Sequence, residues 1–393
     1  MKIENLDDEL GQEIKAALRE MAYSTRASKD FKKRLMKMIL DNHPEMKKKI
    51  AVIFGGCSPE YDISLQSAYG VIKNIDTDKY FPVLIGITRD GKWRLFQGDV
   101  EGIKSDTWND DAFCSSVAVV PDRSESAIIR YSDSEIEMIH IDAAFPILHG
   151  KNGEDGTVQG VLEVGGIPII GCGVLSSALC MDKERAHRLV SERGISVPKS
   201  FVIDRNTERK TIETYAETIG YPLFIKPIRA GSSFGVAKVS ESKDLTEAIN
   251  KAFDYDDKII MEENIKGFEV GCAVMGGVAI KVGEVDEIEL SDGFFDYTEK
   301  YSLKNSAIHV PARIDKSTAE QIKKTAKQIY RILDCNVFAR VDMFLSDTGE
   351  IFFNEVNTIP GFTEHSRFPN MMKAAGYTFE QVVRMSIEQV LEK

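Results

Sequence analysis

The feature that most restricts the fold is a continuous apolar run at residues 50–54, which ends directly in Gly55-Gly56. An uninterrupted apolar run that meets a tight turn is typical of a strand buried on both faces of a parallel sheet. A helical pattern follows at residues 64–74, and a second strand pattern at residues 81–87. Because parallel strands need crossover connections that are usually helical, this alternation predicts an α/β fold that begins near residue 46.

Later parts of the chain continue this alternation. Residues 221–226 and 258–262 have strand patterns, and residues 337–356 are expected to form a hairpin around the turn Ser346-Asp347-Thr348-Gly349. The expected helix starts are Asp182, a capping box of Ser317 and Glu320, and a capping box of Thr378 and Gln381. A length of 393 residues suits two to three domains, so the pattern predicts a multi-domain α/β chain.

Residues 1–45 differ from the rest of the chain. Their apolar residues follow helical spacing in two short stretches, with charged residues on the opposite face. We therefore predict a short N-terminal extension of two amphipathic helices that packs on itself or on its neighbour. Binding of a partner is the alternative role for this extension.

Composition and charge exclude several classes of function. Lysine and arginine number 50 against 62 aspartate and glutamate residues, a net charge of −12 that repels a nucleic-acid backbone. The longest uncharged stretch, residues 164–181, contains glycines and a proline that argue against a membrane span. The six cysteines form no CxxC pair and no secretory signal opens the sequence, so we expect a reduced, cytoplasmic protein. We expect neither a nucleic-acid partner nor a membrane partner.

The hairpin carries four polar residues, Arg340, Asp342, Glu355 and Asn357. Side chains alternate along a strand, so a turn with an even number of residues would place Asp342 opposite Phe353 and all four polar residues on one face. Val341, Met343 and Phe352 would line the other face. Two carboxylates and an amide on one face suit a magnesium ion, typically completed by ATP phosphates and water. A solvated face of ion pairs is the alternative interpretation.

Two other segments have patterns that could bind ATP. Lys226 ends a strand, and the loop at residues 227–235 offers the backbone N–H groups and hydroxyls of its glycines and serines to a phosphate. A plain mobile turn is the alternative for this loop. A strand edge at residues 261–265, with Glu269 nearby, could bind adenine and ribose. Surface acids without a ligand are the alternative there.

Six stretches, taken in order, form a specific pattern. They are Gly55-Gly56-x-Ser58-x-Glu60, Leu148-His149-Gly150-x-x-Gly153-Glu154-Asp155-Gly156, Met181-Asp182-Lys183, Gly231-Ser232-Ser233, Arg340-Val341-Asp342, and Asn354-Glu355-x-Asn357-Thr358-x-Pro360-Gly361. Together they resemble the D-alanine–D-alanine ligase family, which has the ATP-grasp fold, over nearly all of residues 48–393. The resemblance implies three α/β domains behind the N-terminal extension of residues 1–45. These are residues 46–172 with the first D-alanine site, residues 173–262 with the phosphate loop, and residues 263–393 with the magnesium site, the ω-loop and the second substrate site.

The resemblance also implies a reaction and the residues that perform it. ATP phosphorylates the carboxylate of D-alanine, and the amine of a second D-amino acid then attacks the acylphosphate. The residues implied for catalysis are Glu60, Ser232, Tyr301, Arg340 and Gly361, with His149 near the first D-alanine. Those implied for ATP binding are Lys183, Lys226, Ser233, Glu262, Glu263, Ile265, Glu269 and Lys300. Two magnesium ions, for which manganese could substitute, are implied on Asp342, Glu355 and Asn357, and a homodimer is implied because relatives are commonly homodimers.

Departures from the ordinary ligases point to the second substrate. Ser366 matches the position that contacts the carboxylate of this substrate, and Arg367 stands where an apolar residue usually faces the methyl group of D-alanine. Phe295 stands where a tyrosine is usual, and Asp286 matches the edge of the same pocket. These residues are similar to those of the D-alanine–D-serine ligases of vancomycin resistance, particularly the VanG type.

We therefore predict an ATP-dependent ligase that joins D-alanine to D-serine for peptidoglycan precursors, with a role in vancomycin resistance. An ordinary D-alanine–D-alanine ligase, with Arg367 as a surface arginine, is the first alternative. An inactive ATP-grasp module that binds a nucleotide or a D-amino acid is the second. D-Lactate is disfavoured as second substrate because Glu299-Lys300-Tyr301 keeps the loop tyrosine of the peptide-forming ligases.

Overall fold

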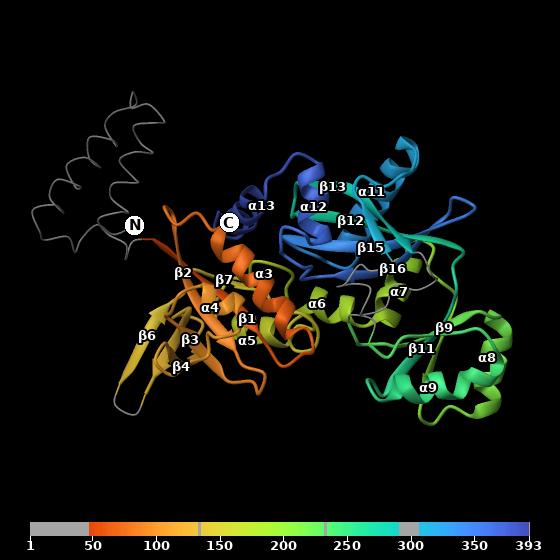
Figure 1. Cartoon of the computed structure of the whole chain (residues 1–393), viewed down its shortest axis with the longest axis horizontal. Coiled ribbons are helices and arrows are strands. Elements are labelled where there is room, and N and C mark those ends of the chain that lie inside the picture. The colour runs from red at the N-terminus through yellow and green to blue at the C-terminus, as the bar shows by residue number, and fades with distance from the viewer. Residues whose placement is uncertain (1–46, 133–134, 232–233, 291–305, 393) are drawn as a thin grey trace, which may run out of the picture.

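A computed structural model describes residues 47–132, 135–231, 234–290 and 306–392, and the predicted extension at residues 1–45 lies outside these ranges. The described chain forms three β-sheets with helices around them (Figure 1). The first sheet occupies one end of the molecule, and the second and third lie toward the other end. The predicted mixed α/β architecture is confirmed, whereas the exact domain limits stay predictions. No helix within the described ranges is both long enough and apolar enough to cross a membrane.

The first sheet has seven strands in the order β6-β5-β4-β3-β2-β1-β7. Its strands are β1 (Lys48–Gly55), β2 (Tyr80–Ile87), β3 (Trp93–Phe96), β4 (Cys114–Val119), β5 (Ala127–Tyr131), β6 (Ile136–His140) and β7 (Ala143–Pro146). The helices of this part are α3 (Tyr61–Lys73), α4 (Glu101–Lys104) and α5 (Thr157–Val164). β1 runs parallel to both of its neighbours, β2 and β7, and Ile50 to Phe54 are buried. This confirms the predicted buried parallel strand.

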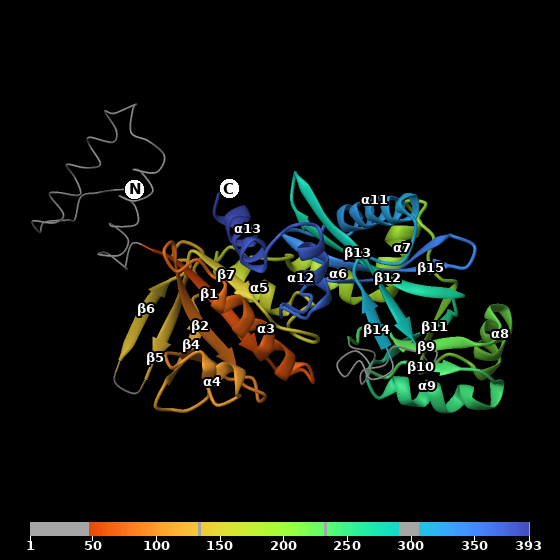
Figure 2. The same cartoon turned by 45° about the horizontal axis from the view of Figure 1, so that its top comes forward.

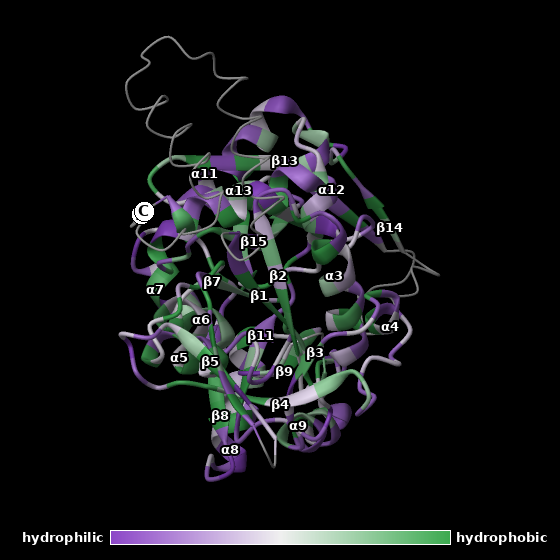
Figure 3. Ribbon diagram, turned by 90° about the vertical axis from the view of Figure 1, so that its left-hand side faces the viewer, coloured by the Kyte–Doolittle hydropathy of each residue, from purple (hydrophilic) through white to green (hydrophobic). Residues whose placement is uncertain are grey.

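The second sheet is antiparallel, with strands in the order β10-β9-β11-β8. Its elements are β8 (Ser200–Asp204), α8 (Arg209–Ile219), β9 (Leu223–Pro227), β10 (Ala237–Val239), η2 (Ser242–Asp244), α9 (Leu245–Phe253) and β11 (Lys258–Glu263). Its hydrophobic cluster draws only on residues between Ile203 and Met261. In Figure 3 hydrophilic residues predominate on the outer helix α8, while hydrophobic residues gather in strands such as β1 and β2.

The third sheet is also antiparallel, in the order β14-β13-β12-β15-β16. Its strands are β12 (Gly267–Gly276), β13 (Ile280–Leu290), β14 (Ser306–His309), β15 (Phe338–Ser346) and β16 (Ile351–Asn357). The helices packed around it are α6 (Val174–Met181), α7 (Lys183–Ser191), α11 (Lys316–Ile332), α12 (Arg367–Ala374) and α13 (Phe379–Leu391). Figure 2 shows α11 and α7 lying over this sheet.

The caps of these helices agree with the prediction in two cases of three. Asp182 caps α7, and Thr378 with Gln381 forms the capping box of α13. The capping box predicted from Ser317 and Glu320 is wrong. Asp315 is the cap of α11, because its carboxylate accepts hydrogen bonds from two backbone N–H groups of the first turn, those of Ser317 and Thr318.

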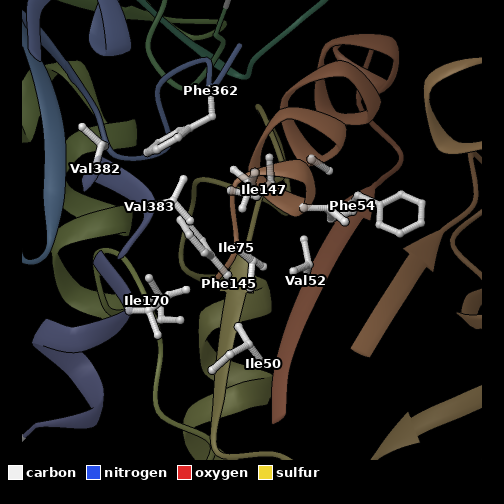
Figure 4. Packing of buried hydrophobic residues seen from close by; sticks show 14 of the residues in the cluster. Ile50, Val52, Phe54, Ile75, Phe145, Ile147, Ile170, Phe362, Val382 and Val383 are labelled. Carbon is white, nitrogen blue, oxygen red and sulfur yellow. The ribbon is translucent and has the colours of Figure 1, made fainter. Parts of the chain in front are cut away.

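One hydrophobic cluster joins the first and third sheets. It combines residues of β1 and β7 with residues of β15, α12 and α13 (Figure 4). At its centre the ring of Phe145 lies 5.8 Å from that of Phe338 and 5.9 Å from that of Phe362. Phe362 in turn packs on Phe368 at 5.4 Å. This packing fixes the loop at residues 358–366 against strands β7 and β15.

Candidate active site

A β-bulge determines which side chains of the β15–β16 hairpin share a face. Met343 pairs with Phe353, but the preceding residue, Asp342, pairs with Glu355, which leaves Asn354 as an extra residue on β16. The predicted pairing of Asp342 with Phe353 is therefore wrong. A bulge adds one residue to one strand, and simple alternation along the sequence does not reveal it.

The bulge nevertheless produces the polar face that was predicted. Arg340 pairs with Asn357 directly beside the pair of Asp342 and Glu355, so the four polar residues lie on one face. The opposite face belongs to the hydrophobic core through Val341, Met343, Phe353 and Val356. Phe352, which was predicted for that core face, instead pairs with Phe344 on the polar side.

Cations pair with the carboxylates of this polar face. Arg340 donates to Asp342 from Nε at 2.8 Å and from Nη2 at 2.6 Å, and Asn357 Nδ2 donates to Asp342 at 2.9 Å. Lys183 Nζ lies 3.3 Å from Glu355 Oε2. The side chain of Asp342 is only 1% exposed. The ion pairs of the alternative interpretation are thus present, but Asp342 is buried rather than solvated.

The donor set on this face fits magnesium by its chemistry. Asp342 and Glu355 supply carboxylate oxygens, and Asn357 uses its Nδ2 toward Asp342, which leaves its amide oxygen for a cation. Across the described ranges, no group of three or more His, Cys, Asp and Glu side chains is arranged to hold a metal ion. An ion bound here would need further oxygen ligands from outside the protein, such as phosphate oxygens and water.

The two predicted phosphate-binding lysines lie on different elements, Lys183 on α7 and Lys226 on β9. Lys183, in the first turn of α7, also donates to the carbonyl of Ala230 at 2.9 Å. It therefore connects the loop at residues 227–235, called the glycine loop below, to β16. Lys226 on β9 pairs with Glu262 on β11. A cavity of about 40 Å³ lies beside Lys183, and the residues lining it include Glu60, Cys180, Lys183, Gly231, Glu355 and Asn357.

The residues predicted for adenosine separate into two groups. Glu262 is buried, and its Oε2 has no hydrogen-bond partner among the described atoms, whereas Glu263 accepts from the backbone N–H of Lys199 at 2.7 Å. Ile265 lies half-buried in the turn that follows β11. Glu269 on β12 instead lies 2.9 Å from Arg367 Nη1, which places its carboxylate in the cluster around that arginine.

Glu60 lies where three loops converge. It is buried directly before α3. A Cβ atom added to Gly150 would lie 2.4 Å from Glu60 Oε2, and one added to Gly231 would lie 3.2 Å from the same atom. The two glycines therefore let the loop after β7 and the glycine loop approach this carboxylate closely.

His149 is a neutral residue that connects two loops. Its Nδ1 donates to the carbonyl of Ile359 at 2.9 Å, and its Nε2 lies 3.3 Å from the hydroxyl of Ser67. Burial lowers the pKa of His149 to about 4, so the ring is uncharged at neutral pH. His149 therefore orients the loop that leads to Gly361.

Glu154 is a functional candidate for which no role was predicted, although it lies within one of the matching stretches. Its carboxylate accepts from the backbone N–H groups of Gly150 at 2.8 Å and Ile359 at 3.1 Å. Burial and the neighbouring carboxylate of Glu60 raise its pKa to about 8. The residue type could have indicated a role for Glu154 in the sequence, because an acid between glycines in a buried loop needs N–H donors.

Arg367 lies inside the protein rather than on its surface. It begins α12 and is 8% exposed. Its Nε and Nη2 donate to the two oxygens of Asp286 at 2.7 and 2.8 Å, and its Nη2 lies 3.4 Å from Asp342. The structure thus brings together Asp286, Arg367 and Asp342, and it rules out the surface arginine of the first alternative.

Gly271 on β12 makes room for this cluster. A Cβ atom there would lie 2.4 Å from Arg367 Nη2 and 2.6 Å from Asp286 Oδ1, closer than real side-chain atoms approach. Nearby, Ser366 accepts from the backbone N–H of Thr363 at 3.1 Å, and a Cβ atom on Gly361 would lie 2.8 Å from its hydroxyl. Gly361 and Ser366 are therefore close neighbours, as their predicted roles require.

The remaining predicted site residues are Ser232, Ser233, Phe295, Lys300 and Tyr301, and they lie outside the described residues.

The three sheets and this polar face define a ligase of the ATP-grasp type. Residues 49–172 match the family described as D-ala D-ala ligase N-terminus, and residues 189–388 match D-ala D-ala ligase C-terminus. The chain therefore belongs to the D-alanine–D-alanine ligase family, whose members use ATP and a divalent metal ion.

Individual relatives fall into several groups of this family. A D-alanine–D-alanine ligase of Caldicellulosiruptor bescii is 44% identical over 88% of this chain and 96% of its own. The vancomycin B-type resistance protein VanB of Enterococcus faecalis is 44% identical over 88% of this chain and 99% of its own. The crystal structure of the VanG D-Ala:D-Ser ligase from Enterococcus faecalis is 54% identical, with a TM-score of 0.83 over 88% of this chain and 100% of that one.

Proposed function

We propose that this ligase joins D-alanine to D-serine in an ATP-dependent reaction that supplies peptidoglycan precursors and vancomycin resistance. The observation that carries the proposal is the buried pair of Arg367 and Asp286 beside Ser366. The 54% identity to a VanG D-Ala:D-Ser ligase supports it. D-Alanine as second substrate is the alternative, supported by the 44% identity to a D-alanine–D-alanine ligase.

In the first step, a carboxylate oxygen of D-alanine attacks the γ-phosphorus of ATP, and ADP leaves. Lys183 and Lys226 hold the phosphates, while Glu262 and Glu263 with Ile265 hold adenosine. Asp342, Glu355 and Asn357 would hold two magnesium ions, or manganese in their place, which would supply positive charge to the phosphates. Glu60 pairs with the ammonium group of D-alanine and thereby aligns its carboxylate.

In the second step, the amine of the acceptor attacks the carbonyl carbon of D-alanyl phosphate, and inorganic phosphate leaves with formation of the peptide bond. Arg340 and the backbone N–H of Gly361 stabilise the oxyanion that develops on this carbonyl. Ser232 and Tyr301, with Glu60, close the site so that water does not hydrolyse the acylphosphate. Ser233 and Lys300 contact the phosphates, and Glu269, whose carboxylate also contacts Arg367, would reach the ribose.

The second substrate is selected by polarity next to Ser366. Carboxylates of Asp286 and Glu269 contact Nε, Nη1 and Nη2 of Arg367, so D-serine meets a guanidinium that is already paired with acids rather than an isolated cation. Its hydroxyl can accept from a remaining N–H group or donate to Asp286, whereas the methyl group of D-alanine can do neither. Hydrogen bonds to charged groups contribute about 1.5–3 kcal/mol. Phe295 completes this pocket.

Product identification tests the proposal directly. The purified protein receives ATP, magnesium and equal concentrations of D-alanine and D-serine near pH 7, and the dipeptides are measured by mass spectrometry. We expect D-alanyl-D-serine to predominate. A predominance of D-alanyl-D-alanine would instead support the alternative, and ADP release without either dipeptide would contradict both.

Light scattering of the same purified protein tests the predicted homodimer.

A further inference from the structure

One face of helix α7 contacts three consecutive residues of β16. Lys183 and His187 are four residues apart and so lie on the same side of the helix. Lys183 lies 3.3 Å from Glu355 Oε2, His187 Nε2 lies 2.7 Å from the carbonyl oxygen of Asn354, and the His187 ring packs against Phe353 at 5.4 Å. Helix α7 therefore contacts β16 directly at its bulge.

The contact between His187 and Asn354 determines which ring nitrogen of the imidazole carries the proton. A carbonyl oxygen can only accept, so Nε2 carries the proton and donates to Asn354. His187 is 4% exposed, and its Nδ1 has no hydrogen-bond partner among the described atoms. Burial lowers the pKa of His187, which favours the neutral ring. The ring thus has one donor, and that donor faces the bulge.

The bulge is the feature that brings the predicted metal ligands together. Without the extra residue, continuing the pairing of Met343 with Phe353 would set Val341 opposite Glu355. Glu355 and Asn357 would then turn toward the hydrophobic core, away from Asp342. The carbonyl of the extra residue has no place in the ladder of an ordinary hairpin, and His187 satisfies it. A second anchor is the hydrogen bond from Phe353 N to the carbonyl of Ser196 at 2.9 Å.

We propose that His187 is a positioning residue that fixes the bulge at Asn354 and thereby holds Glu355 and Asn357 on the same face as Asp342. This inference rests on the proposed role of those three side chains in metal binding. His187 itself contacts neither the metal nor the substrates. Its single N–H donor sets the register of β16, while its ring fills the space against Phe353.

Two substitutions separate the donor from the ring. His187→Phe keeps a flat ring against Phe353 but removes the donor, whereas His187→Gln keeps an N–H donor at similar reach. Val190→Ala is the matched control, because Val190 is a fully buried residue of the same helix. Each protein is loaded with a non-hydrolysable ATP analogue, and binding of manganese is measured by electron paramagnetic resonance. Hydrogen exchange of residues 351–357 is measured without any ligand.

We expect His187→Phe to raise the manganese dissociation constant about tenfold, as for the loss of a buried hydrogen bond. It should also speed hydrogen exchange in β16. His187→Gln should stay within about twofold of the wild type in binding, and Val190→Ala should melt earlier without a change in manganese affinity. Equal behaviour of the Phe and Gln variants, or unaltered exchange in His187→Phe, would overturn the inference.

The metal assignment has its own test. Asp342→Asn and Glu355→Gln should abolish manganese binding, and wild-type binding in both would refute the proposed metal site. The exchange of residues 351–357 in the ligand-free protein is independent of that result, so the two failures are distinguishable.

Discussion

The polar face of the third sheet and the buried pocket around Glu60 both contain carboxylates, but they handle charge in opposite ways. On the third sheet, Asp342 is matched by Arg340 at 2.6 Å. In the pocket, Glu154 lies near a second acid, Glu60, and backbone N–H groups are its hydrogen-bond donors. The comparison teaches that a facing cation compensates for the burial of one carboxylate, whereas burial beside another acid raises the pKa of the other.

The largest effect on activity is expected on the polar face of the third sheet, where Arg340 faces Asp342. Asp342→Asn should lower kcat by about 10²- to 10³-fold, because it removes a charge proposed to hold the metal that neutralises the phosphates. Steady-state kinetics at saturating ATP measures this. Asp347→Asn, in the exposed turn of the same hairpin, is the control and should retain the wild-type rate. A similar loss in both variants would show that the hairpin, rather than the polar face, is disturbed.

A smaller effect is expected from a larger residue at Gly271, next to the cluster of Arg367, Asp286 and Asp342. Gly271→Ala places a methyl group 2.4 Å from Arg367 Nη2 and should destabilise the protein by about 1–3 kcal/mol, as overpacking does. Urea unfolding of the ligand-free protein measures the difference. Gly160→Ala on helix α5 is the control, because a Cβ atom there would lie 3.9 Å from its nearest neighbour, Val174, and it should not destabilise the protein. Equal stability of the two variants would mean that the cluster moves aside freely.

The selectivity of the second site should change by about tenfold when its hydrogen bond is removed. Arg367→Leu should shift the ratio of kcat/KM for D-serine over D-alanine toward D-alanine. Because the single change leaves Asp286 buried without its partner, the double variant Arg367→Leu with Asp286→Asn is compared with it. An unchanged ratio in the double variant would remove this pair from the specificity argument.

In the pocket of paired acids, the expected effect is on the pH dependence of stability. The pKa of Glu154 is raised from the ordinary 4.5 to about 8, so the native state binds more protons than the unfolded state between these values. The stabilising contribution of this group is complete below pH 4.5 and is lost as the pH rises through 8. Glu154→Gln should flatten this part of the stability profile, because glutamine does not titrate between these pH values. Unfolding measured from pH 5 to 9 tests this, and parallel profiles would contradict it.

Much of the fold could be predicted from local patterns, because residues 50–54 of β1 form an uninterrupted apolar run and the caps at Asp182 and Thr378 are strong signals. The polar face of the hairpin was also predicted, but through a wrong register. Leu345 pairs with Ile351, so the turn contains an odd number of residues, and the bulge at Asn354 adds one more residue. These two shifts of one residue together return the polar residues to the predicted face. A bulge depends on contacts with residues elsewhere in the chain, here the contact with His187 that is proposed to fix it. The alternation of residues within the hairpin does not reveal such contacts.

The buried contacts of the site were harder to predict. Arg367, Asp286 and Gly271 come from three elements, and only the folded sheet shows that one guanidinium reaches both Asp286 and Glu269. Glu154 was visible as a residue type but not as a member of a buried pair. In each case the missing information is a contact between residues far apart in the sequence.

The separation of the hydrophobic clusters has a consequence for unfolding. Phe145 and Phe338 belong to one cluster that spans the first and third sheets, whereas the cluster of the second sheet is built only from its own residues. Cooperativity in unfolding follows shared cores. The first and third sheets should therefore lose structure together, while the second sheet can open at a lower free energy. Calorimetry of the ligand-free protein would then show two transitions, and a nucleotide bound at Lys226 and Glu262 would bring them closer together.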